Sequence, residues 1–215
     1  MMIKVKLYKT DMPVSANYIK ERVNNNLYDE QKGFGFHIIK DDDDLEVMFT
    51  LRSVNKQQVE YANGEHSEIE TVSYLNVKFC IMFGKGIAMY ALNPPLSMKI
   101  PYAMIHKIFG ESSGLKPIEI DLKKLVIDFS NKFDLKIKSV SFSNIQLDAF
   151  TLAKTKIASS RKVSDFHIDS YMNTSAILDA IHFTVNGIET ELSRTGRFRV
   201  RENQLSTLLA MLENN

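Results

Sequence analysis

Alternation of apolar and polar residues predicts that much of this chain forms β-strands. The segment 3–7 alternates in this way and fits a half-buried strand. Two longer β-like runs, 45–61 and 66–83, flank Asn63-Gly64, and a third run covers 87–92. Asn-Gly favours a type I′ hairpin turn, because both central residues of that turn need positive φ. We therefore expect a three-strand antiparallel meander with an unusually long first hairpin.

The register of this hairpin is the first difficulty. A strict two-residue loop would place Phe49 opposite Lys78, and the apolar residues of the two strands would point to opposite faces. A β-bulge or a longer loop restores one apolar face. The tip, 53–73, is mostly polar, so it is either a β-arm that projects from the body or a twisted edge hairpin or partly disordered loop.

A second hairpin is predicted at Asn186-Gly187. Here the two-residue loop pairs Val185 with Ile188, and the apolar residues further along both strands share one face. The Arg197–Arg201 strand follows. Ser15 and Asp121 are suitable N-caps for two helices. Further helices are expected over 101–109 and 205–212, and a further strand over 163–171. The segment 145–157 is ambiguous, and its apolar spacing favours a helix.

The elements follow one order twice: strand, helix, strand, Asn-Gly hairpin, strand, helix. We therefore expect an α+β fold with a predominantly antiparallel sheet, a long bulged β-hairpin and helices packed on one side. The chain is expected to be one globular unit with pseudo-repeat halves 1–112 and 113–215. This order resembles the two-repeat saddle of the TATA-binding-protein fold, which implies one curved antiparallel sheet with helices on its convex side. None of that family's residue motifs occurs here, so the resemblance implies no function.

Composition restricts the class of protein only broadly. The chain has 215 residues, 44% hydrophobic and 25% charged, with a formal net charge of +1. Its single cysteine, Cys80, excludes an internal disulfide. No apolar run approaches the roughly 18 residues of a membrane span, and the alternating N-terminus differs from a signal peptide. We expect a cytoplasmic protein without membrane contact.

The strongest candidate for a functional site is a group of arginines near the C-terminus. Arg197, Arg199 and Arg201 alternate with apolar residues, so a strand would place them on one face about 6.6 Å apart. Such a row suits phosphates or carboxylates. The alternative is a solvated strand face on which the arginines pair with Glu189 and Glu191. The predicted nucleic-acid-binding residues are Arg194, Arg197, Arg199, Arg201, Lys154, Lys156, Arg161 and Lys162.

A second surface is expected on the long hairpin, where polar side chains of the arm would contact a partner. The predicted partner-binding residues are Asn55, Lys56, Gln57, Tyr61 and His66. The exposed edges of so long a hairpin also favour a homo-oligomer formed through the hairpin or an edge strand.

Catalytic patterns are largely missing from the sequence. It contains no P-loop, no Gly-x-Ser-x-Gly and no His-Glu-x-x-His, and Asp41–Asp44 lacks the glycine and glutamate of an EF-hand. Glu119, Asp121 and Lys123 could serve a metal-dependent nuclease, although Asp121 also suits a helix cap. We expect no resident metal and no cofactor.

The sequence therefore favours a non-enzymatic binding protein that engages nucleic acid or a protein partner. The sheet face, the arginine-bearing strand and the protruding hairpin would form the contacts. A metal-dependent nuclease is the first alternative. An accessory or scaffold subunit of a phage or anti-phage defence assembly is the second.

Overall fold

The computed structural model describes residues 1–83, 86–146, 150–158 and 176–213. The predicted α+β class is confirmed: eleven antiparallel strands and four helices lie within these ranges. The elements form two compact units. One unit comprises Met1–Lys9, Lys85–Ile87 and Lys116–Asn215, and the other comprises Thr10–Gly84 and Ala88–Leu115.

The second of these units, which we call the arm unit, has four antiparallel strands in the spatial order β2-β3-β4-β5. Its core lies between the apolar face of the strands and two helices. Ile19 of the first helix, Phe109 of the second helix and Ile81 of a strand are all buried and line the same small cavity. Its elements are α1 (Ala16–Asn24), β2 (Phe34–Asp41), β3 (Leu45–Glu60), β4 (His66–Ile81), β5 (Met89–Leu92), α2 (Lys99–Phe109) and the 3₁₀ turn Glu111–Ser113.

The long hairpin resolves its register through a longer loop. Glu60 pairs with His66, which leaves a five-residue loop, 61–65, and places Phe49 opposite Val77. All sixteen residues of each strand pair without interruption, so the predicted bulge in this hairpin is wrong. Only Gly64 has positive φ in the loop, because the Asn63 side chain accepts a hydrogen bond from the Glu65 amide and holds a different turn.

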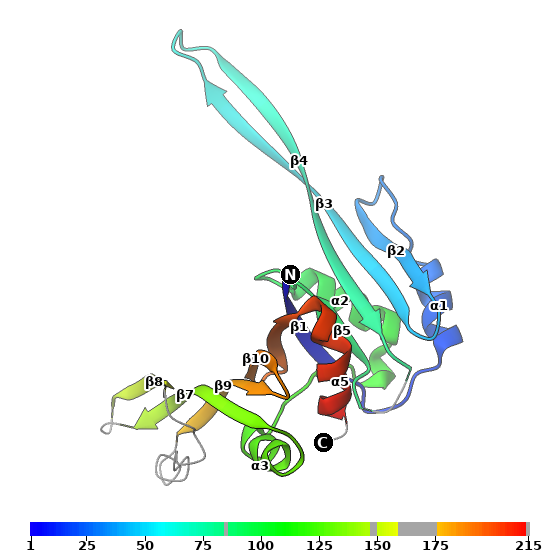
Figure 1. Ribbon diagram of the computed structural model, residues 1–215. Helices are drawn as coiled ribbons and strands as arrows, with labels where there is room; N and C mark the ends of the chain where they lie inside the picture. The colour runs from blue at the N-terminus through cyan, green and yellow to red at the C-terminus, as the bar shows by residue number, and fades with distance from the viewer. Residues whose placement is uncertain (84–85, 147–149, 159–175, 214–215) are drawn as a thin grey trace. The chain divides into compact units, whose positions relative to one another are not determined.

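The outer half of this hairpin projects from the rest of the unit. β2 pairs with β3 only as far as Leu51, and β5 pairs with β4 only between residues 78 and 81. Figure 1 shows β3 and β4 continuing together beyond both neighbours. We call residues 53–73 the arm. About nine residues on each side extend roughly 30 Å, so the projecting arm is the correct one of the predicted alternatives.

The other unit, which we call the basic unit, pairs its strands antiparallel in the order β1-β11-β10-β9-β7-β8, with β6 beside β1. The predicted Asn186-Gly187 register is confirmed, since Val185 pairs with Ile188 and both turn residues have positive φ. Its elements are β1 (Met2–Lys9), β6 (Lys116–Pro117), α3 (Leu122–Lys132), β7 (Leu135–Gln146), β8 (Leu152–Ala158), β9 (Ile177–Val185), β10 (Ile188–Ser193), β11 (Arg197–Arg201), the 3₁₀ turn Glu202–Gln204 and α5 (Leu205–Glu213).

One face of this sheet is covered by helices. Phe129 of α3 packs edge-on against Phe183 of β9, with 6.0 Å between ring centres. Leu212 of α5 lies near Leu7 and Leu125 around a cleft of about 210 Å³. The alternating buried side chains of these strands, such as Leu7 and Phe183, therefore point toward α3 and α5. The alternate side chains, together with the buried Tyr8, lie on the opposite face.

The structure corrects the helix expected over 145–157. β7 continues to Gln146, and 152–158 forms β8, which pairs with β7 across a bulge between Phe142 and Ile145. Positive φ at Asn144 accommodates this bulge. The strand expected over 163–171 falls on residues outside the described ranges.

Candidate nucleic-acid interface

Two neighbouring strands of the basic unit carry a concentrated group of cations. β1 and β11 pair antiparallel, with Lys4 opposite Arg199 and Lys6 opposite Arg197. Phe198 and Val200 are buried and the arginines between them are exposed, as the alternation predicted. Directly opposed residues of paired strands lie on one face of the sheet. The basic face, as we call it, consists of Lys4, Lys6, Arg197, Arg199 and Arg201, on the side opposite α3 and α5.

The acids expected to neutralise the arginines are engaged elsewhere. Glu189 pairs with Lys138 and also contacts His182 at 3.0 Å. Glu191 lies opposite Arg199 in the β10–β11 register, but its carboxylate pairs with Lys156 at 3.7 Å. Within the described ranges, no ion pair joins an acid to any of the three basic-face arginines. The predicted neutralisation by Glu189 and Glu191 is therefore absent there.

This arrangement is unfavourable for folding by itself. Like charges directly opposite each other on paired strands destabilise a sheet. Burial lowers the pKa of Lys6, and the positive charge of Arg197 lowers it further. The Lys6 ammonium also lies 5.3 Å from the centre of the Tyr8 ring.

The fourth predicted arginine differs from the other three. Arg194 lies in the turn before β11, and its guanidinium Nε is 2.9 Å from a carboxylate oxygen of Asp179. The same two residues share a backbone hydrogen bond of 2.9 Å from the Arg194 amide to the Asp179 carbonyl. Because Asp179 already balances its charge, we do not include Arg194 in the basic face.

The predicted lysine group is separated from the arginines by intervening strands. Lys154 and Lys156 are exposed on β8, at the far end of the strand order from β1 and β11. Lys156 is paired with Glu191, as described above. Arg161 and Lys162 lie outside the described residues. The structure therefore brings Lys4 and Lys6, rather than these lysines, beside the arginine row.

The predicted partner-binding residues of the arm are all exposed, but they lie on different faces. Asn55 and Gln57 are on one face of the β3–β4 ribbon, whereas Lys56 and His66 are on the other. Tyr61 begins the loop, and its hydroxyl is 3.2 Å from the Ser67 hydroxyl. The opposite-face placement follows from the observed register and divides this group into two separate surfaces.

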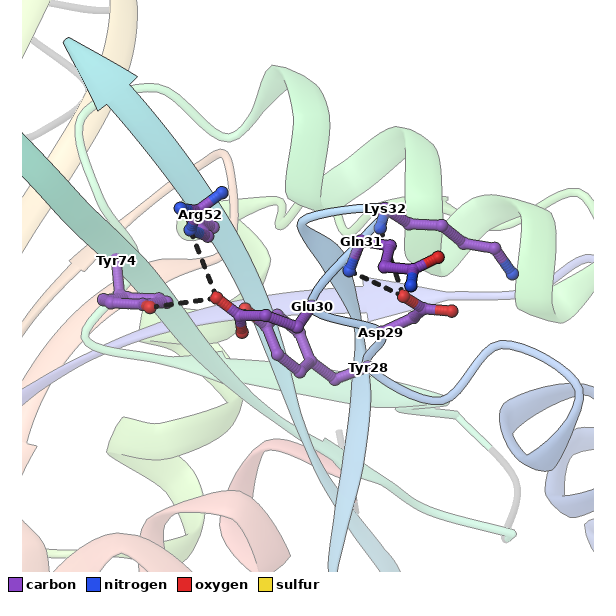
Figure 2. A network of polar contacts seen from close by, with 7 residues as sticks. All are labelled: Tyr28, Asp29, Glu30, Gln31, Lys32, Arg52 and Tyr74. Atoms are coloured by element: carbon purple, nitrogen blue, oxygen red, sulfur yellow. Dashed lines mark hydrogen bonds and ion pairs between the residues drawn. The ribbon is translucent and has the colours of Figure 1, made fainter.

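A polar network braces the root of the arm (Figure 2). Glu30, in the loop before β2, accepts a hydrogen bond of 2.7 Å from the Tyr28 hydroxyl and lies 3.2 Å from Arg52 Nε. The Tyr74 hydroxyl approaches the same carboxylate at 3.5 Å. The hydrogen bond to Glu30 raises the pKa of Tyr28 to about 12. This loop thus attaches to both strands at the point where the arm begins.

The position suggested for a nuclease centre has a structural role. Asp121 is the N-cap of α3, and its carboxylate accepts hydrogen bonds from the amides of Lys123 and Lys124 at 3.0 and 3.1 Å. Within the described ranges, no three His, Cys, Asp or Glu side chains are grouped so that they could hold a metal ion.

Comparison with known proteins gives no assignment. No family model matches the chain, and no curated protein matches its sequence. Among the described residues, no helix has both the length and the apolar character needed to cross a bilayer.

Proposed function

We propose that the chain is a binding protein whose basic face contacts the phosphate backbone of a nucleic acid. The observation that carries the proposal is the row of three exposed arginines on β11, which have no acidic partner among the described residues. Lys4 and Lys6 extend this row onto β1. Five cations on two strands form a surface suited to a polymer with regularly spaced negative charge.

The spacing supports a phosphate polymer as the ligand. Alternate residues of one strand are about 6.6 Å apart, roughly twice the 3.4 Å axial rise per phosphate along one strand of duplex DNA. Guanidinium groups can bind phosphate oxygens through two parallel hydrogen bonds. A rigid, paired strand holds such groups in a fixed row before the ligand arrives.

Contacts of this kind position the ligand without distinguishing its bases. Tyr8, whose ring lies near the Lys6 ammonium, is fully buried and cannot stack on a base. The basic face itself therefore offers charges and hydrogen-bond donors to phosphates, and recognition by this surface is expected to be independent of sequence.

The test is binding of the purified chain to labelled single-stranded and duplex DNA of mixed sequence, followed by fluorescence anisotropy. If each arginine contributes about 1 kcal/mol, replacing Arg197, Arg199 and Arg201 together with alanine weakens binding on the order of 100-fold. The matched control is Arg194→Ala, because that guanidinium already pairs with Asp179. Unchanged binding by the triple variant, or an equal loss in the control, would overturn the assignment.

A further inference from the structure

The charges of the arm are unequally divided between the two faces of its ribbon. Residues 53–73 contain four glutamates and one lysine, a net charge of −3 with histidine neutral. The β3–β4 register places Glu60, Glu68 and Glu70 on one face, which we call the acidic face. The fourth glutamate, Glu65, is in the loop. The opposite face of the arm carries serine, threonine, asparagine, glutamine and a few apolar side chains.

The acidic face has an apolar continuation toward the root of the arm. Val72 follows Glu70 at the next position of the same face and lies directly opposite Val54. Their side chains are 44% and 40% exposed. Lys56, the single cation of the arm, is 2.8 Å from Glu68 and 3.9 Å from Glu70, so it is shared between these carboxylates. An isolated two-stranded ribbon is only marginally stable in water, so a surface that covers it would add stability.

The basic face has the complementary pattern in the same spacing. Along β4 the alternate positions are acid, acid and apolar: Glu68, Glu70 and Val72. Along β1 they are base, base and apolar: Lys6, Lys4 and Met2, the last with 55% of its side chain exposed. Both rows follow alternate residues of a strand and therefore share a spacing of about 6.6 Å. Arg197, Arg199 and Arg201 form a second cationic row beside Lys6, Lys4 and Met2.

We infer that the acidic face of the arm in one copy of this chain docks on the basic face of a second copy. The carboxylates of Glu68 and Glu70 then meet the cations, and Val54 and Val72 meet Met2. Docking relieves the repulsion within the basic face and covers the exposed valines. The docked arm occupies the surface that we assign to phosphates, so nucleic acid and self-assembly compete. This competition rests on the proposed function, whereas the docking does not.

A charge exchange tests the docking. Analytical ultracentrifugation of the full chain at rising concentration should show a salt-sensitive increase in mass. Glu68→Lys with Glu70→Lys should abolish that increase, and so should Arg197→Glu with Arg199→Glu. An equimolar mixture of these two double variants should restore a complex, because the surfaces of one variant are opposite in charge to the surfaces of the other. A control that adds charge on the opposite face, Asn55→Lys with Gln57→Lys, should still assemble.

Three results would overturn the docking. The first is a wild-type chain that remains monomeric at all concentrations. The second is a mixture of the two double variants that does not associate. The third is loss of assembly in the opposite-face control, which would show that only the total charge of the arm matters.

Competition has a separate readout. Where the concentration of undocked wild-type arms is twice the dissociation constant of assembly, mass action weakens the binding of wild type to labelled DNA about threefold relative to the Glu68→Lys, Glu70→Lys variant. Equal DNA binding by assembled wild type and this monomeric variant would overturn the competition. Failure of the variant to bind DNA at all would instead contradict the proposed function and leave the measured assembly in place.

Discussion

Replacing Arg197 with glutamate should stabilise the protein. Arg197 lies opposite Lys6 on β1, and its backbone amide donates a hydrogen bond of 3.2 Å to the Ser193 hydroxyl; neither neighbour is acidic. The substitution removes one like-charge pair and creates one opposite-charge pair. Cross-strand charge pairs are worth about 0.2–1 kcal/mol each. The two effects together raise the free energy of unfolding by about 0.4–2 kcal/mol, since the exposed site allows the new side chain to fit without repacking.

The neighbouring position provides the matched comparison. Arg199 lies opposite Lys4 on one side and opposite Glu191 on the other. Arg199→Glu therefore gains one favourable pair and creates one unfavourable pair, so its net effect on unfolding should be near zero. Glutamine at position 197 should give about half of the gain, because it removes repulsion without adding attraction.

Urea unfolding followed by circular dichroism measures these differences. At low ionic strength the order of stability should be Arg197→Glu, then Arg197→Gln, then wild type. The gain should shrink in 1 M salt, where charges are screened within about 3 Å. The pKa of Lys6 should also rise in the Arg197→Glu variant, because a nearby cation that lowers it is gone. A variant that is no more stable than wild type, or a gain unaffected by salt, would refute the cross-strand repulsion.

Three further predictions concern other parts of the structure. The Thr190 hydroxyl is buried without a hydrogen-bond partner among the described residues, so Thr190→Val should raise the free energy of unfolding by about 1 kcal/mol in urea unfolding; destabilisation would contradict this. Tyr28 should ionise near pH 12 in a difference titration of tyrosinate absorbance against Tyr28→Phe, and Glu30→Gln should lower that midpoint toward 10. Because the folded-state pKa is raised, the stabilisation from Tyr28 is complete below pH 10 and is lost as pH rises toward 12; a midpoint of 10 in wild type would contradict the Glu30 contact. Asn186→Ala should lower the free energy of unfolding by about 1–2 kcal/mol, because Asn186 has φ of 46° and its side chain accepts a hydrogen bond from the Asp134 amide. Asn63→Ala should lower it by less, because Asn63 does not have positive φ. Equal losses of stability would contradict the difference between the two turns.

Features that depend on neighbouring residues were predictable from the sequence. Ser15 and Asp121 cap their helices as expected, since capping needs only a side-chain oxygen and an amide two or three residues later. The Asn186-Gly187 hairpin has the predicted register because its two-residue turn fixes the pairing of both strands. The alternation of Arg197–Arg201 was enough to predict which side chains are exposed.

Features that depend on distant or competing contacts were not predictable. The apolar spacing between 145 and 157 fits a helix, yet pairing with β7 selects a strand for 152–158. Asn63-Gly64 lacks the type I′ turn because alignment of the apolar faces of β3 and β4 outweighs the local preference.

The composition of the basic face could not be predicted from the sequence for the same reason. Lys4 and Lys6 are nearly two hundred residues from Arg197, and only the pairing of β1 with β11 makes them neighbours. The alternation of lysines in the first strand was visible in the sequence. It could not show which strand would lie beside them, because strand pairing across such a separation has no local signal.

The salt dependence of DNA binding tests the central claim most directly. If all five cations of the basic face contact phosphates, the logarithm of the association constant should fall against the logarithm of salt concentration with a slope of about −4.5 for duplex DNA, or about −3.5 for a single strand. Removing the three arginines of β11 should make the slope shallower by about 2.7 or 2.1, respectively, and Arg194→Ala should leave it unchanged. A slope near zero in wild type, or the same slope in wild type and the triple variant, would contradict the basic face as a phosphate-binding surface.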